Sequence, residues 1–271
     1  MSRLDLEYFY LSGLPIDIKH KQLGVIYQPK LIDFINSGLE MSMFSHPFIL
    51  NKEMIVNKNE EIENALEGLG RLKFLVVYDS LTAKSREKTG QKGIIDLLKE
   101  SLSLLYKTED VVVMETLPAI VIGKDVLITD DNFEYLTNLV VEMLRIDIVE
   151  MRKRIEEERK RKEQEENEDP ILKKFREKER EYKEKNNTQD ENSFFDLINV
   201  VVHSQGTIDY DRVFNMTVYQ LKNSYNTIIK KEVYSASLMH RISPNFQPTD
   251  DFKLWEEKSC VVKSGLNNEE K

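Results

Sequence analysis

The residues that could do chemistry in this chain are its four histidines, a pair of glycines and two pairs of aspartates. The histidines, His20, His46, His203 and His240, each stand alone in the sequence. None lies within one helical turn of another, and none has the two-histidine-plus-glutamate spacing of a zinc hydrolase. Because metal and acid–base sites need several such side chains together, we expect these histidines to be structural or surface residues.

A short glycine motif at residues 68–73, Gly-Leu-Gly-Arg-Leu-Lys, has a superficial likeness to a phosphate-binding loop. It lacks the terminal glycine-lysine-serine/threonine of that loop, and no strand precedes it. Two nearby glycines more often mark a helix break or a close packing contact. We therefore interpret Gly68 and Gly70 as structural residues.

The acidic pairs Asp130-Asp131 and Asp250-Asp251 fall where helices are predicted to begin. Paired carboxylates can hold a metal ion or exchange protons, but acidic side chains also stabilise helix N-termini electrostatically, and we favour this second interpretation. No serine or cysteine nucleophile motif is present. The sequence therefore predicts a protein that is not an enzyme, with no catalytic residues, no cofactor and no metal site.

Composition narrows the class of protein further. The chain has 271 residues, enough for one large domain or two small ones, with 40% hydrophobic and 32% charged residues. Its net charge is −9, whereas a nucleic-acid-binding protein typically has a basic surface. The one cysteine, Cys260, excludes an intrachain disulfide and fits a reducing cytosol. Because no signal peptide and no apolar run of ~20 residues is visible, we expect a soluble cytoplasmic protein without membrane contact.

Residues 1–147 show mixed strand and helix patterns and are predicted to form a small α+β module. The polar residues 81–92 are predicted to form a loop, and residues 12–15 a turn. Helices are predicted at about 29–38, 59–77 (interrupted by the two glycines), 94–105 and 129–144. Strands are predicted at 8–11, 24–27, 111–114, 119–122 and 126–128, the last two forming a hairpin.

The composition then changes. Residues 148–190 are almost wholly charged or amide-bearing, with acid–base pairs four apart such as Glu156–Lys160, which favour a solvated helical linker without a sustained coiled-coil seam. Residues 191–257 regain apolar periodicity and are predicted to form an all-α module, with helices at 194–206, from Thr217 to about Met239 and at 250–255, and with a short segment at 210–216 that leads to Thr217. Residues 258–271 form a polar tail. The fold class is thus α+β and mainly helical.

The C-terminal module is unusually rich in aromatic residues, and we take Phe214, Tyr219, Tyr225 and Trp255 as its candidate partner-binding residues. Tyr219 and Leu221 lie two apart, so they cannot share one face of a helix. Leu221 starts a stripe that continues through Tyr225, so it is predicted to be buried, and Tyr219 is predicted to be exposed.

Two stretches carry a resemblance to a known family. Residues 23–35, Leu-Gly-Val-Ile-Tyr-Gln-Pro-Lys-Leu-Ile-Asp-Phe-Ile, combine a short apolar strand, a tyrosine, a proline and a helix. Residues 208–221 contain Met216-Thr217 and end in Tyr219-Gln220-Leu221, and a late tryptophan, Trp255, follows. Together they resemble tail assembly chaperone-like proteins of phages and prophages of low-GC Gram-positive bacteria.

The resemblance implies a chaperone of the host cytoplasm that binds the tape-measure protein, the tail-tube protein or both during tail morphogenesis. Apolar helix faces would suit the binding of an amphipathic client helix, and the net negative charge of the chain would keep the complex soluble. A homo-oligomer is also compatible with the sequence. Two alternatives stay open: a structural component of the phage tail or baseplate, and a cytosolic adaptor protein unrelated to phage.

The loss of apolar periodicity after residue 147 leads to a first prediction, on proteolysis. We expect limited proteolysis to cut first between Glu163 and Asn192 and to leave two resistant fragments, because the two modules bury their apolar residues and the linker has few to bury. Mass spectrometry of the fragments measures the cut sites. A linker that outlasts either module would contradict this division.

Overall fold

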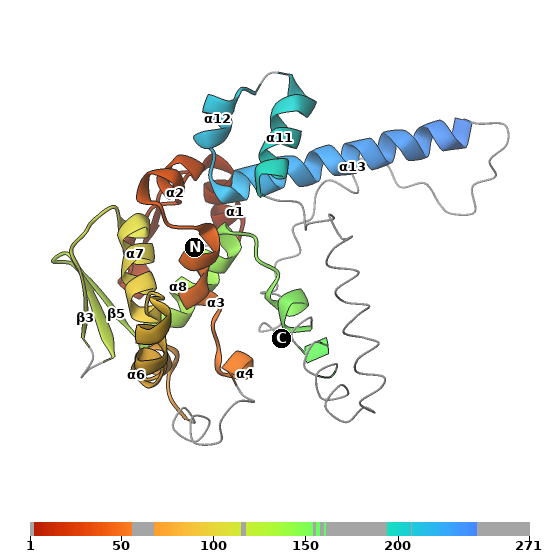
Figure 1. Ribbon diagram of the computed structural model, residues 1–271. Coiled ribbons are helices and arrows are strands. Elements are labelled where there is room, and N and C mark those ends of the chain that lie inside the picture. The colour runs from red at the N-terminus through yellow and green to blue at the C-terminus, as the bar shows by residue number, and fades with distance from the viewer. Residues whose placement is uncertain are drawn as a thin grey trace, which may run out of the picture.

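The computed structural model describes residues 3–55, 68–114, 118–153, 156–157, 160, 194–206 and 208–242. Over these residues the chain has the predicted α+β, mainly helical fold (Figure 1). Its labelled elements are α1 (Arg3–Ser12), β1 (Ile16–Ile18), η1 (Lys19–Lys21), β2 (Gly24–Ile26), α2 (Leu31–Ser37), α3 (Met41–Ile49), α4 (Lys52–Ile55), α6 (Arg71–Thr89), α7 (Ile94–Tyr106), β3 (Val111–Met114), β4 (Ala119–Ile122), β5 (Val126–Thr129), α8 (Asp130–Met143), α11 (Phe194–Gln205), α12 (Tyr210–Phe214) and α13 (Val218–Ile242).

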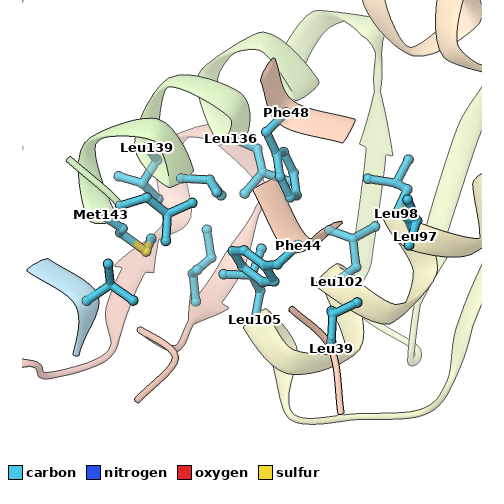
Figure 2. Close-up of a cluster of buried hydrophobic side chains, with 14 of the residues drawn as sticks. Leu39, Phe44, Phe48, Leu97, Leu98, Leu102, Leu105, Leu136, Leu139 and Met143 are labelled. Atoms are coloured by element: carbon cyan, nitrogen blue, oxygen red, sulfur yellow. The ribbon is translucent and has the colours of Figure 1, made fainter. Parts of the chain in front are cut away.

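The core of the N-terminal part forms where α3 packs against α7 and α8. Figure 2 shows Phe44 and Phe48 of α3 between the leucines of α7 and those of α8. Phe44, Phe48 and Leu102 are almost completely buried, and each such side chain contributes about 1.5–3 kcal/mol through removal from water. The helical spacing of Leu98, Leu102 and Leu105 explains why the predicted helix 94–105 is confirmed as α7.

The predicted strand at residues 8–11 is wrong, because these residues belong to α1. Tyr10 is buried on one face of this helix, whereas Tyr8 and Leu11 are exposed on others. An aromatic run favours a strand only where a neighbouring strand is there to pair with it, so tertiary packing overrides the preference here. The predicted turn after α1 is confirmed, with Gly13 at a φ of +70°.

The strands form two small antiparallel sheets, β1–β2 and β3–β4–β5. In the three-stranded sheet, Val113, Ile120 and Ile128 face one another across the strands, and the two isoleucines are buried. The opposite face of the sheet exposes Val112 and Leu127. All three strands were predicted from their β-branched residues, and α8 follows β5 directly with Thr129 as its N-cap.

Two helices of this core begin at a glycine and are capped by a carboxylate from another element. At the start of α6, the backbone N–H of Leu72 donates to Oδ1 of Asp130 over 2.7 Å, and that of Lys73 does so over 3.3 Å. A Cβ atom on Gly70 would lie 2.5 Å from Cγ of Asp130, so only glycine fits. The structural interpretation of Gly70 is thus confirmed: the anion at this loop is the chain's own Asp130.

The start of α7 repeats this arrangement and corrects the loop predicted at residues 81–92. Ile95 N–H donates to Oδ1 of Asp79 (3.3 Å), and Arg86 forms an ion pair with Asp79 (2.9 Å). Both charged residues belong to α6, which continues to Thr89 and ends at Gly90 with a φ of +67°. Residues 81–89 are polar because they lie on a solvated helix, and Asp79 joins that helix to the first turn of α7.

Several predictions concern residues that the structure does not describe. The predicted helix at 59–77 can be followed only from residue 68, and the helix at 250–255 and the tail at 258–271 lie outside the described residues. Most of the predicted linker does as well. Within it, residues 148–153, 156–157 and 160 are helical, and Lys160 pairs with Glu156 over 2.7 Å at the expected spacing of four.

Buried tyrosines lead to a prediction for alkaline pH. Burial raises the pKa of Tyr106, whose hydroxyl donates to the backbone oxygen of Leu23 over 2.9 Å. The folded protein therefore keeps a proton that the unfolded chain releases above pH ~10, so the free energy of unfolding falls by about 1.4 kcal/mol per pH unit for each such tyrosine. We expect Tyr106→Phe to reduce this slope. Urea unfolding of parent and variant from about pH 9 to about pH 11 measures it. Equal slopes for the two proteins would contradict the assignment, since all other groups titrate alike in both.

Candidate partner-binding surface

The described residues contain no grouping that resembles a metal centre. No cluster of three or more histidine, cysteine, aspartate or glutamate side chains is placed to hold a metal ion within the part of the chain that the structure describes. His46 and His203 are both exposed, and His203 contacts the ring of Tyr210 edge-on. Among the described helices, none is both long and apolar enough to span a bilayer.

Helices α11, α12 and α13 form a unit in which α11 packs along α13. Its core consists of aliphatic side chains from all three helices: Ile198, Val201, Val213, Val218, Leu221 and Ile228. Asp209 caps α12 by accepting from the N–H of Arg212 (2.9 Å). Thr217 and Gln220 cap α13 reciprocally, each side chain accepting from the other's backbone N–H. The sequence prediction that Thr217 starts this long helix is confirmed.

This helical unit is fastened to the N-terminal part of the chain by backbone and side-chain hydrogen bonds. Leu31 N–H donates to the carbonyl of Met216 over 3.0 Å, next to a β-bridge between Lys30 and Thr217. The Gln220 amide donates to the carbonyl of Leu11 over 2.8 Å. Three ends of elements thereby meet: the end of α1, the start of α2 and the start of α13.

An aromatic and charged cluster lies at the same junction. The rings of Tyr10 and Tyr219 stack with centroids 5.2 Å apart, and the Tyr10 hydroxyl donates to Glu142 over 3.0 Å. The guanidinium carbon of Arg145 lies 5.2 Å from the Tyr219 ring centroid, and its Nη1 donates to Asn223 over 2.9 Å. Burial raises the pKa of both tyrosines, so each stays neutral and its ring stays available for stacking.

Lys222 completes the junction from the first turns of α13. Its Nζ donates to the carbonyl of Leu144 at the C-terminal end of α8 over 2.8 Å, where a positive charge is favoured by the helix dipole. Burial, and secondly the charge of Arg145, lower the pKa of Lys222. The amine thus acts as a cap for α8 beside the positive charge of Arg145.

The structure corrects one prediction about the candidate residues. Tyr219 is only 3% exposed, so the prediction that it faces solvent is wrong: its ring stacks with Tyr10 and lies against the guanidinium of Arg145. Leu221 is fully buried, as predicted. Phe214 and Tyr225 are partly buried and pack against the core, and Trp255 lies outside the described residues. A role of these four in partner binding stays a prediction.

Besides Phe195 of α11, which is 71% exposed, and Tyr210 of α12, the exposed apolar side chains of the C-terminal part lie on the distal half of α13. In Figure 1, α13 runs past α11 and away from the body of the protein. Val233 is 54% exposed and Met239 is 75% exposed on this projecting half, and Leu238 is exposed as well. The sequence predicts the helix as far as about Met239 but does not predict the exposure of these residues, because periodicity does not tell whether a partner element is present.

A second apolar surface is the outer face of the three-stranded sheet. Val112 lies opposite Val121, which lies opposite Leu127, so one row across the sheet is wholly apolar. Val112 and Leu127 are exposed, together with Met114 of the next row. Figure 1 places this sheet at the end of the molecule opposite to the tip of α13.

The class of protein that these features define is a mainly helical α+β protein with two exposed apolar surfaces and, among its described residues, no metal-binding cluster. Residues 183–259, a range that includes α11, α12 and α13, match the family model of the YomV second domain. YomV is a Bacillus prophage protein, so the C-terminal part of the chain is similar to a phage-derived family. No curated protein matches the chain, and no solved structure does.

The junction leads to a prediction on stability. Tyr219→Ala removes a buried ring between Tyr10 and Arg145, and we expect it to lower the free energy of unfolding by about 3–5 kcal/mol, as for other buried aromatic residues. Tyr219→Phe keeps the stacked ring and is expected to cost about 1 kcal/mol or less. Urea unfolding followed by circular dichroism measures both. If the two variants are equally stable, the ring stacking does not hold α13 in place.

Proposed function

We propose that this protein is a phage tail assembly chaperone, non-catalytic, which binds the tape-measure protein, the tail-tube protein or both during tail morphogenesis. The observation that carries the proposal is the projecting half of α13, an apolar helix surface in the region that is similar to a phage-derived family. The resemblance of residues 23–35 and 208–221 to tail assembly chaperone-like proteins supports the same assignment.

The physical requirements of such a chaperone fit the molecule. A holdase needs exposed apolar surface on a stably folded body, because it must bury client side chains without unfolding itself. Here the body is supplied by the packing of α3, α7 and α8, and the exposed apolar side chains lie on α13 and on the outer sheet face. The net charge of −9 opposes self-association of loaded complexes.

A structural tail or baseplate component is the second candidate, and the outer sheet face favours it. The row Val112–Val121–Leu127 would be buried permanently in a particle, as apolar sheet faces are in stable assemblies. The third candidate, a cytosolic adaptor protein unrelated to phage, would use the same surfaces for a bacterial partner.

Co-expression separates the three candidates. We expect the tape-measure protein or the tail-tube protein from the same gene cluster to stay soluble and to co-purify with this chain, because the exposed apolar side chains cover apolar client surface. We also expect the chain to be absent from purified virions by quantitative mass spectrometry. Stoichiometric presence in virions would assign a structural component. If the chain is absent from virions and binds neither tail protein, the third candidate function, a cytosolic adaptor protein, would be favoured.

A further inference from the structure

The three-stranded sheet has two edge strands, β3 and β5, and their open sides differ. In β5, the N–H of Thr129 and the carbonyl of Leu127 are both bound by the side chain of Asn132 in α8. Thr129 N–H donates to Oδ1 of Asn132 over 2.8 Å, and Nδ2 of Asn132 donates to the Leu127 carbonyl over 2.9 Å. The open side of β5 is therefore covered by a side chain of the same chain, and a further strand cannot pair there.

The backbone of β3 has a definite phase relative to β4. Gly123 N–H donates to the carbonyl of Asp110 over 2.9 Å, and hydrogen-bonded pairs alternate along an antiparallel ladder from there. Val112 and Met114 therefore direct their N–H and carbonyl groups towards β4. Val113 lies between them, so its N–H and carbonyl point to the open side of the sheet.

The open side of β3 lacks the cover that Asn132 gives to β5. Within the part of the chain that the structure describes, no group binds the N–H or the carbonyl of Val113. Figure 1 shows β3 at the periphery of the molecule. The strand is wholly apolar, without the charged residue or proline that keeps many edge strands from pairing. Ile128 and Ile120 of the inner row are fully buried, whereas Val113 at the end of that row is only partly buried.

We propose that β3 pairs antiparallel with β3 of a second copy of this chain, around a two-fold axis at Val113, so that the two sheets become one. The N–H of each Val113 donates to the carbonyl of the other, which is the two-bond pattern of an antiparallel pair. On the outer face Val112 lies opposite Met114 of the partner subunit, and on the inner face the two Val113 side chains adjoin. Every cross-strand pair at the centre of the interface is thus apolar.

A second copy fits this edge because the strand is complementary to itself. Registers that pair Val111 would need its N–H, which already donates to the carbonyl of Glu109 over 3.0 Å. The axis at Val113 instead pairs two free groups with each other. The Asp110 residues of the two copies then lie at opposite ends of the pair, about 20 Å apart along the strands, so the acids do not face each other. Because Asn132 covers β5, the assembly ends at two copies.

The dimer is expected to be weak and to depend on salt in a characteristic direction. A strand of four residues forms a smaller interface than a permanent dimer has, and the net charge of −9 on each chain opposes association. Salt screens this repulsion, so the dimer tightens as salt is raised, whereas a dimer held by ion pairs would loosen.

Sedimentation velocity of the full-length chain measures the dimer. The chain is compared from about 2 µM to about 200 µM, at about 0.05 M and about 0.5 M NaCl. We expect the weight-average mass to rise with concentration from that of one chain towards that of two, and to rise earlier at the higher salt. A mass that stays at one chain throughout, or that grows well beyond two chains, would overturn the proposal.

A proline variant tests the backbone pairing itself. Proline has no N–H, and the N–H of Val113 lies outside the β3–β4 ladder, so Val113→Pro is expected to keep the parent's circular dichroism spectrum and to weaken the dimer by about tenfold or more. Val112→Pro is the matched control for the direction of these groups. It removes an N–H that faces β4, so it should lower the melting temperature more than Val113→Pro does. A folded Val113→Pro that dimerises like the parent would contradict the pairing.

Side-chain variants separate edge pairing from packing of the outer sheet faces, and they decide the matter even if a proline unfolds β3. Met114 is 40% exposed and Leu127 is 47% exposed on the same outer face, but Leu127 belongs to the covered edge strand β5. We expect Met114→Lys to weaken the dimer by about fivefold or more and Leu127→Lys to dimerise like the parent. Equal loss in both would mean that the outer faces pack together, and the proposal would be wrong.

The dimer goes beyond the proposed function and can be judged apart from it. If the chain dimerises as described but no tail protein co-purifies, the pairing of β3 stands and the chaperone function fails. If a tail protein co-purifies with a chain that is monomeric under every condition, the function stands and the pairing of β3 does not.

Discussion

The first turns of α13 are held by groups from two other parts of the chain, α1 and the end of α8, and this junction determines where the exposed half of the helix points. Tyr219 stacks on Tyr10 of α1 and lies under Arg145, just after α8. Lys222 binds the carbonyl at the end of α8, and Gln220 binds the carbonyl of Leu11. Stacking and hydrogen bonds have narrow geometric requirements, so together they define one direction for a helix that apolar contacts alone would leave free to rotate.

The two halves of α13 share one apolar sequence pattern but differ in their roles. In the first half, Val218, Leu221 and Ile228 complete the core of the helical unit and stabilise the fold. In the second half, Ile229 and Val233 continue the apolar pattern without a covering element among the described residues. The first half supplies the rigidity that a binding surface needs, and the second half supplies the surface.

In the N-terminal part of the chain, polar contacts likewise add to apolar packing. Asp130 and Asp79 stabilise the starts of α6 and α7 from outside those turns, which ties the helices together in addition to their apolar packing. The Asp130 carboxylate accepts from the N–H groups of Leu72 and Lys73 and lies against Gly70, so the glycine motif at 68–73 serves folding. The division between modules 1–147 and 191–257 as independently folding units stays a prediction, and the contacts at α13 show that the two share one junction.

Periodicity and turn chemistry in the sequence were sufficient for α7, α8, the three-stranded sheet and the N-cap at Thr217, because each depends on residues close together in the chain. The strand predicted at residues 8–11 and the loop predicted at 81–92 were wrong, because each helix is held by contacts that the local sequence does not show: Tyr10 of α1 donates to Glu142, and Asp79 of α6 accepts from the N–H of Ile95 in α7. The burial of Tyr219 and the exposure of Val233 were likewise decided by tertiary structure. A sequence pattern indicates which apolar residues would be stabilised by burial. Only the folded arrangement of the other elements determines which of them are buried.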